Sequence, residues 1–131
     1  MSIDLKTLNP ARTALILCDL QNDFLHPKGA YGRSGVTSPE IASIPARMER
    51  VIKAMRQVGC SVVSTHFTLV LGRDGEPLIS DHLRAVRPFL AKGDFQSGGW
   101  GHDLFDLLKP SDEKIEKVAF SAFYMSRLEW Y

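Results

Sequence analysis

Residues 14–24, ALILCDLQNDF, join an apolar run of strand length to a carboxylate, Asp19, and then to a polar segment prone to turns. A run that is apolar on both faces is typical of a central strand in a parallel sheet with helices on each side. In open α/β sheets, ligands bind in the crevice beyond the carboxyl ends of the strands. The stretch therefore predicts an α/β fold with Asp19 at the edge where such folds place their chemistry.

Downstream of this stretch the pattern continues as strand, helix, strand. The first strand covers about residues 13–18, and apolar positions at helical spacing predict a helix over 41–58, closed by Gly59. A β-branched run predicts a second strand over 61–66, and a short third strand is expected over 114–118. The crossover between the first two strands should be right-handed.

The remaining segments are expected to be loops and shorter helices. Glycines and prolines at the start of residues 26–40 indicate a long loop. A short helix is expected near residues 82–89 and another over 102–108. Residues 122–131 are predicted to be helical, with Ser121 as the N-cap.

Composition limits the class of protein. The chain has 131 residues, 44% of them hydrophobic, which predicts one domain, residues 1–131. Its 16 basic and 15 acidic residues leave a net charge of +1, so bulk charge gives no reason to expect a nucleic-acid or membrane partner. No signal peptide or membrane span is recognisable, and two cysteines in unrelated settings form no disulfide framework. We expect a cytoplasmic protein.

Two charged residues stand at the same rim of the predicted sheet. Asp19 follows the first strand, and Lys117 lies near the carboxyl end of the third. Taken singly, Asp19 could simply cap the turn, and Lys117 could be a solvated strand end. Together, a carboxylate and an ammonium can hold each other charged and poise a nucleophile or a proton.

The sequences around these two residues resemble a known family. LCDLQNDF (17–24) followed by KVAFSAF (117–123) is similar to the isochorismatase-like hydrolases, which include cysteine amidohydrolases of the nicotinamidase and N-carbamoylsarcosine amidohydrolase type. The resemblance covers nearly the whole chain. It implies a three-layer α/β/α Rossmann-like fold with strand order 3-2-1-4-5-6, of which this chain supplies about the first three strands. It also implies an Asp-Lys-Cys triad, with Asp19 as general base and Lys117 as its electrostatic partner.

The nucleophile is the member of that triad that this sequence does not supply. In the family, the cysteine follows a further strand, some tens of residues beyond the lysine. Cys18 adjoins Asp19 on a strand, so its side chain should point to the opposite face as a small buried hydrophobe. Cys60 should lie at the other end of the sheet. We therefore expect the cysteine to be absent from this chain and the domain to be incomplete at its C-terminus.

Metal binding is not expected. Nicotinamidase-type members bind a divalent metal through an Asp-x-His pair after the second strand, but no Asp lies two residues before His66. His66 is expected to be a hydrogen-bonded pocket or core residue, His82 and His102 to be solvated, and His26 at most to face the crevice. No other cofactor is implied.

Three residues are predicted to bind substrate: Phe24, His66 and Trp100. Phe24 and Trp100, with Phe67 and Phe95, could wall an apolar pocket, although aromatic residues at such positions serve equally well as core. Arg73 could meet a substrate carboxylate or could simply be an exposed turn charge.

Two functions remain open. The first is a cysteine hydrolase that cleaves a C–N bond in a small amide or ureido compound. The alternative is a catalytically silent member that binds a small ligand or forms an oligomer. In a three-stranded sheet the first strand would be an apolar edge, which is a pairing hazard. The chain is therefore either a part of a longer protein or a short form that completes its sheet with another subunit, so a homo-oligomer is expected.

Overall fold

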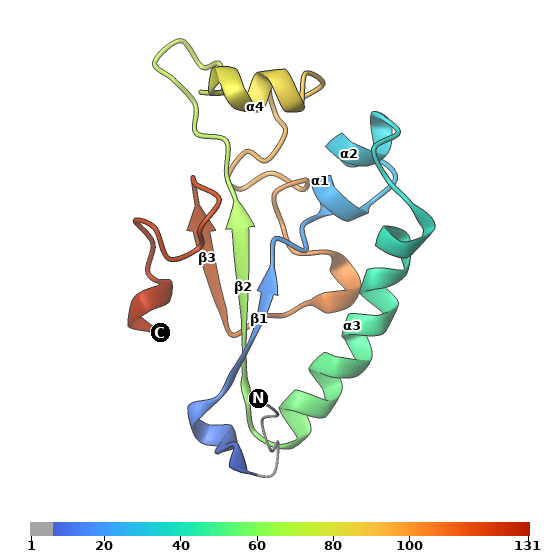
Figure 1. Cartoon of the computed structure of the whole chain (residues 1–131), viewed down its shortest axis with the longest axis vertical. Helices are drawn as coiled ribbons and strands as arrows, with labels where there is room; N and C mark the ends of the chain where they lie inside the picture. The colour runs from blue at the N-terminus through green and yellow to red at the C-terminus, as the bar shows by residue number, and fades with distance from the viewer. Residues whose placement is uncertain (1–6) are drawn as a thin grey trace.

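Three parallel strands form the centre of the structure, a computed structural model that describes residues 7–131. They are β1 (Ala14–Cys18), β2 (Ser61–Phe67) and β3 (Glu113–Lys117), hydrogen-bonded in the order β1-β2-β3 (Figure 1). All three predicted strands are confirmed within one residue at each end. The parallel sheet with helices packed on it is the predicted α/β class, and its order matches the 3-2-1 part of the expected topology.

Helix α3 (Pro39–Gln57) is the crossover between β1 and β2. It begins two residues before the predicted start, because Ser38 caps it by accepting the Ile41 N–H at 3.3 Å and Pro39 fits the first turn. Gly59 follows the helix with φ 84°, a left-handed conformation that glycine adopts at no steric cost. The predicted helix and its glycine cap are therefore confirmed.

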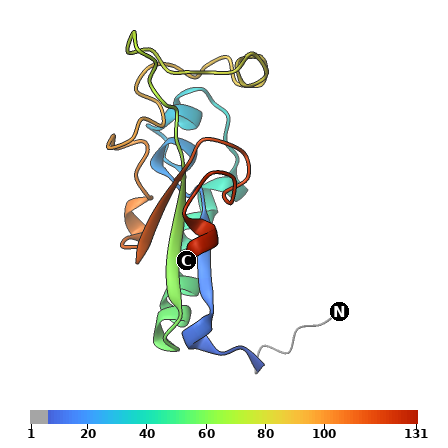
Figure 2. The ribbon, with the colours of Figure 1, turned by 90° about the vertical axis from the view of Figure 1, so that its left-hand side faces the viewer.

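The two faces of the sheet are covered by different segments. On one face, β1 and β2 pack against α3 and the 3-10 helix η3 (Asp106–Leu108) through a buried cluster. This cluster consists of Leu17, Ile52, Val62, Leu104 and Leu108. On the other face, Val63 and Ile115 pack against Leu128 of the 3-10 helix η4 (Leu128–Trp130). Figure 2, seen from the β3 side, shows η4 and the segment around η3 on opposite sides of the sheet.

Strand β1 is an edge strand with one bare face. Its residues alternate, so that Leu17 is buried against α3 while Ile16, pointing the other way, is 38% exposed. The expectation that helices cover β1 on both sides is therefore not met for residues 7–131. An apolar edge of this kind favours pairing with another chain, and association stays a prediction.

The helix predicted over residues 102–108 is wrong except for its last turn, η3. The backbone of this segment pairs instead with the stretch that follows β1. The Asn22 N–H donates to the Asp103 carbonyl at 3.0 Å and the Phe105 N–H to the Leu20 carbonyl at 2.9 Å. Long-range backbone pairing thus takes the hydrogen bonds that a helix would need.

The helix predicted over residues 122–131 is also reduced to one 3-10 turn, η4. Met125 has φ 51°, which a non-glycine residue cannot adopt within a helix. The Ser126 hydroxyl donates to the Ala122 carbonyl and accepts the Leu128 N–H, so a side chain replaces helical backbone bonds. Ser121 accepts the Phe123 N–H but caps no helix.

Short elements occupy the remaining loops. The predicted loop 26–40 contains one helical turn, α2 (Ala30–Arg33), and another turn, α1 (Asn22–Leu25), precedes it. The short helix predicted near residues 82–89 is α4 (Asp81–Val86). No helix between residues 7 and 131 combines the length and apolarity needed to cross a bilayer.

Candidate functional site

Asp19 lies directly after β1 in a left-handed backbone conformation, with φ 55°. Only a few per cent of non-glycine residues adopt this conformation, and aspartate is among those that tolerate it. Its N–H faces both the carbonyl and the hydroxyl of Thr65, each at 3.2 Å. The Thr65 hydroxyl in turn donates to Asp19 Oδ1 at 2.6 Å. The end of β2 therefore fixes both the backbone and the carboxylate of Asp19.

Lys117, the last residue of β3, reaches across the end of β2 to this carboxylate. Its Nζ lies 2.7 Å from Asp19 Oδ2, and its side chain is only 7% exposed. The same ammonium donates to the carbonyls of Phe120, at 2.9 Å, and Ala119, at 3.3 Å. It also lies 6.0 Å from the ring centre of Phe67. Three oxygens thus meet the three N–H groups of the ammonium, which keeps a nearly buried charge compensated.

Gln21, two residues after Asp19, anchors the motif to β2. Its side-chain amide accepts the Phe67 N–H at 2.7 Å and donates to the Phe67 carbonyl at 2.9 Å. The amide also donates to the His102 carbonyl at 2.8 Å. A fully buried side chain thus pairs with backbone as a strand would, holding the turn after β1 against β2 and the loop around residue 102.

The buried carboxylate of Asp23 organises the loops above the sheet. It accepts the Ala30 N–H at 3.0 Å and the Phe95 N–H at 2.7 Å. Phe24 packs in the aromatic cluster formed there, with ring centres 4.5 Å from Phe95 and 6.3 Å from Phe67. Phe24 thus lies beside Phe67, whose ring centre is 6.0 Å from Lys117 Nζ, and its predicted role in substrate binding stays a prediction.

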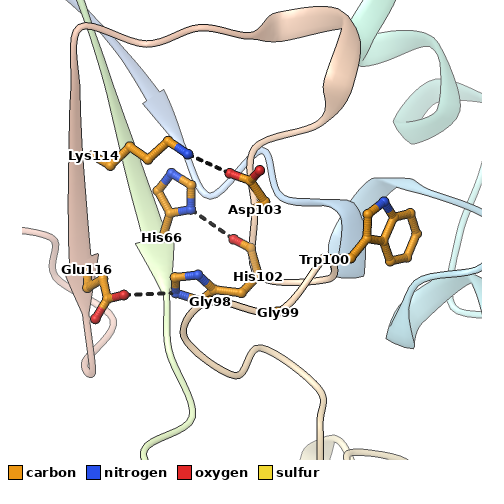
Figure 3. Close-up of a pocket in the computed structure, with 8 residues that line it drawn as sticks. All are labelled: His66, Gly98, Gly99, Trp100, His102, Asp103, Lys114 and Glu116. Atoms are coloured by element: carbon orange, nitrogen blue, oxygen red, sulfur yellow. Dashed lines mark hydrogen bonds and ion pairs between the residues drawn. The ribbon is translucent and has the colours of Figure 1, made fainter.

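A second polar cluster lies on the opposite face of the sheet. His66 precedes Phe67 and pairs in register with Glu116, whereas Phe67 pairs with Lys117, so successive side chains alternate between the faces. His66 lines a cavity of about 380 Å³ beside β3 (Figure 3). The other lining residues are Gly98, Gly99, Trp100, His102, Asp103, Lys114 and Glu116. The Trp100 ring points away from the histidines, and it meets the His26 ring edge-on at 4.9 Å.

Both histidines of this cavity are buried and hydrogen-bonded. The His66 Nδ1–H donates to the His102 carbonyl at 2.8 Å, and Nε2 lies 2.8 Å from the Ser64 hydroxyl. Nε2 of His102 lies 2.8 Å from the Thr68 hydroxyl and 3.7 Å from Glu116. Burial lowers the pKa of His66, and burial together with the neighbouring His66 lowers the pKa of His102. The expectation that His102 is solvated is wrong.

Asp103 carries the charge at the rim of the same cavity. It lies between two ammonium groups, with Lys109 at 2.6 Å and Lys114 at 2.7 Å. Partial burial would raise the pKa of this carboxyl group, but the hydrogen bonds from the two lysines outweigh it and lower the pKa to about 2. The rim is therefore an ion-pair network, while burial lowers the pKa of the histidines behind it and so favours their neutral form.

The structure brings together two of the five predicted site residues. Asp19 and Lys117 form one cluster at the carboxyl end of the sheet, Phe24 packs against Phe67 and Phe95, and His66 and Trp100 line the cavity on the other face. Arg73 and His82 are exposed. Among residues 7–131, no three histidine, cysteine or acidic side chains are grouped so as to hold a metal ion.

The two cysteines differ from each other in exposure. Cys60 is buried before β2, at the far end of the sheet, as expected. Cys18 is exposed, so its prediction as a buried hydrophobe is wrong. It pairs in register with Thr65, and the left-handed turn at Asp19 brings the carboxylate to that same face. The predicted opposite orientation of Cys18 and Asp19 therefore fails because the strand alternation ends at residue 19.

Sequence reasoning missed residues of both clusters, among them Thr65, Gln21 and His102. Thr65 stands in a β-branched run typical of any buried strand, Gln21 has no signal beyond its place in the motif, and His102 begins a segment whose sequence favours a helix. A hydroxyl on the strand beside the Asp19 carboxylate was the available signal for Thr65. No local signal pointed to His102.

Known proteins resemble this chain over almost its whole length. The family model described as the isochorismatase domain matches residues 13–131. Ureidoacrylate amidohydrolase RutB of Caulobacter segnis is 28% identical over 138 residues, which cover 93% of this chain and 56% of that protein. RutB of Serratia proteamaculans is 29% identical over 131 residues, covering 92% and 53% respectively. The chain thus spans about half the length of the curated relatives it matches.

Solved structures resemble the fold to a similar extent. A cysteine hydrolase from Pseudomonas syringae pv. phaseolicola has a TM-score of 0.71 at 22% identity, covering 94% of this chain and 54% of that one. The N-carbamoylsarcosine amidase from Thermoplasma acidophilum has a TM-score of 0.62 at 23% identity, covering 90% and 58%. At these identities the likeness supports the fold alone.

Proposed function

This chain belongs to the isochorismatase family, and from that premise we propose that it is a hydrolase that cleaves a C–N bond in a small amide or ureido compound. The observation that carries the proposal is the ion pair between Lys117 Nζ and Asp19 Oδ2, 2.7 Å apart at the carboxyl end of the sheet. Open α/β folds bind their ligands at that end. The relatives called ureidoacrylate amidohydrolase and N-carbamoylsarcosine amidase support the choice of bond.

In the proposed reaction Asp19 is the general base and Lys117 its electrostatic partner. The carboxylate takes the proton of a cysteine thiol, and the thiolate forms a bond to the substrate carbonyl carbon. The C–N bond breaks, and the amine leaves with the proton that Asp19 returns. Water, deprotonated by Asp19, then cleaves the thioester and restores the thiol. Lys117 holds the carboxylate charged and in place before the proton moves.

The proposed thiol comes from polypeptide outside these 131 residues. Cys60 is buried at the opposite end of the sheet from Asp19. Cys18 shares a face with the Asp19 carboxylate but is itself part of β1, whose backbone is hydrogen-bonded to β2. Phe24, His66 and Trp100 remain proposed substrate-binding residues; of these, His66 and Trp100 line the cavity on the other face of the sheet from Asp19. Residues 1–131 are proposed to belong to one domain.

The test measures turnover of a panel of small amides and ureido compounds by the natural full-length protein. Asp19→Asn and Lys117→Met should each lower kcat about 10²- to 10⁴-fold, the usual contribution of a general base. Lys53→Met is the matched control, because Lys53 pairs with Glu49 on the exposed side of α3. A wild-type protein without turnover would contradict the proposal and favour the catalytically silent alternative.

A further variant identifies the thiol. Cys18→Ser should leave kcat unchanged if the nucleophile comes from elsewhere. Loss of turnover in Cys18→Ser, together with a labelled Cys18 after reaction with a thiol-directed substrate analogue, would contradict that part of the proposal while keeping Asp19 and Lys117 in their roles.

A further inference from the structure

Thr65 contacts Asp19 through its side chain as well as through its backbone. Its hydroxyl donates to Asp19 Oδ1 at 2.6 Å and faces the Asp19 N–H at 3.2 Å, while its own carbonyl accepts the same N–H. A hydroxyl has one proton and two lone pairs, so both contacts can form at once. Thr65 is 1% exposed, and water has little access to compete for these bonds.

The terminal torsion of an aspartate is broad and nearly two-fold, so a single contact leaves the carboxylate free to rock. Lys117 holds only Oδ2. The Thr65 hydroxyl holds Oδ1, and together they define the plane of the carboxylate. The same hydroxyl supports the left-handed backbone of Asp19, a strained conformation that surrounding contacts must offset.

We propose that Thr65 is the positioning residue of this site: its hydroxyl fixes the rotation of the Asp19 carboxylate so that Oδ2 faces Lys117. The inference rests on the proposed function for its catalytic meaning, since a base must be aligned with the proton that it takes. Its structural content, the orientation of Asp19, does not depend on turnover.

A second buried threonine provides a matched control. The Thr68 hydroxyl donates to the His66 carbonyl at 3.1 Å and lies 2.8 Å from His102 Nε2, so it belongs to the opposite face of the sheet. Thr68→Val removes a buried hydroxyl of the same kind without a contact to Asp19. Thr65→Ser keeps the hydroxyl and loses only a methyl group.

The orientation is tested by NMR of the full chain, using the carboxyl ¹³C resonance of Asp19, assigned with Asp19→Asn, and the ammonium resonance of Lys117. Thr65→Val should shift the Asp19 resonance and accelerate exchange of the Lys117 ammonium protons at least about tenfold. Thr65→Ser and Thr68→Val should leave both at their wild-type values. A folded Thr65→Val with unchanged resonances, or a Thr65→Ser that shifts the Asp19 resonance, would overturn the inference; the second outcome decides even if Thr65→Val does not fold.

Kinetics separate this inference from the proposed function. If the wild type turns over substrate, Thr65→Val should lower kcat about 10- to 100-fold with KM unchanged, because misplacement of a catalytic group by about 1 Å can lower the rate about 10²-fold. Thr65→Ser, which keeps the hydroxyl, should have the wild-type kcat. Absence of turnover in the wild type would contradict the proposed function alone, since the resonances of Asp19 and Lys117 would still decide the role of Thr65.

Discussion

Two polar clusters lie at the same end of the sheet, on opposite faces. They differ in how their buried ionisable groups are stabilised. Asp19 and Lys117 form an ion pair of 2.7 Å. For His66 and His102, burial lowers the pKa of both imidazoles, and carbonyl and hydroxyl groups meet both nitrogens of His66 and Nε2 of His102. In the proposed function the first arrangement holds the general base in place, and the second suits a support that stays neutral.

The supporting role of the histidine cluster follows from its contacts. The His102 carbonyl accepts from both the His66 ring and the Gln21 side chain, each at 2.8 Å. Gln21 also pairs with the backbone of Phe67, the residue beneath the Lys117 ammonium. The neutral cluster thus braces the strand ends from which the charged pair projects.

The largest expected effect is on the charged pair. Asp19→Asn should lower the free energy of unfolding by about 3–5 kcal/mol, because it leaves a nearly buried ammonium without its carboxylate. Lys117→Met should cost less, since the Asp19 side chain is more exposed and can gain water. The double variant should be clearly more stable than the sum of the two losses predicts. Urea unfolding measures all three free energies.

If the two losses add within about 0.5 kcal/mol, the pair is not coupled and the distinction between the clusters fails. Lys53→Met again serves as the control, because its exposed ion pair with Glu49 should contribute less than about 1 kcal/mol.

The neutral cluster should reveal itself by its pH dependence. The folded-state pKa values of His66 and His102 lie below the 6.5 of an unfolded histidine. The unfolded chain therefore binds more protons below pH 6.5, and stability should be complete above that pH and fall as the pH decreases through it. Once a histidine is protonated in both states, each unit by which its folded-state pKa lies below its unfolded value lowers the free energy of unfolding by about 1.4 kcal/mol.

Unfolding midpoints in urea between pH 7.5 and 5 measure this fall. His66→Asn should flatten the curve, whereas His82→Gln, on the exposed surface of α4, should leave it unchanged. A wild-type midpoint that stays constant over this range would show that the histidines are not held neutral.

The sequence predicted the charged cluster far better than the neutral one, for a physical reason. Asp19 and Lys117 each end a strand, and the carboxyl ends of parallel strands meet at one edge, so adjacency follows from topology. His102 reaches the sheet only because the backbone of residues 103–105 pairs with residues 20–22. No periodicity in the sequence encodes such a long-range pairing. The same pairing is the reason why the helix predicted over 102–108 does not form.

The predicted orientation of Cys18 and Asp19 is wrong because of a single torsion, the positive φ of Asp19. Strand alternation predicts opposite faces, but the positive φ of Asp19 turns its carboxylate to the face of Cys18 and Thr65. Aspartate tolerates this conformation, but local sequence does not dictate it, and here it is accompanied by contacts from Thr65, 46 positions away in the sequence. Elements with local signals were therefore predictable, and the fine geometry of the site was not.

The smallest effect expected is at the rim of the cavity, where Asp103 combines features of both clusters: it is charged and paired, yet accessible. Its pKa of about 2 lies below the ordinary 3.8, so its stabilisation is present above about pH 4 and is lost as the pH falls toward 2. Because solvent and salt screen the two lysines, Asp103→Asn should cost only about 1 kcal/mol at pH 7. The cost should shrink in 1 M salt, unlike the cost of Asp19→Asn, whose partner is shielded from solvent. A salt-independent loss of stability in Asp103→Asn, as large as that in Asp19→Asn, would contradict this prediction. It would show that solvent exposure does not distinguish the two ion-paired sites.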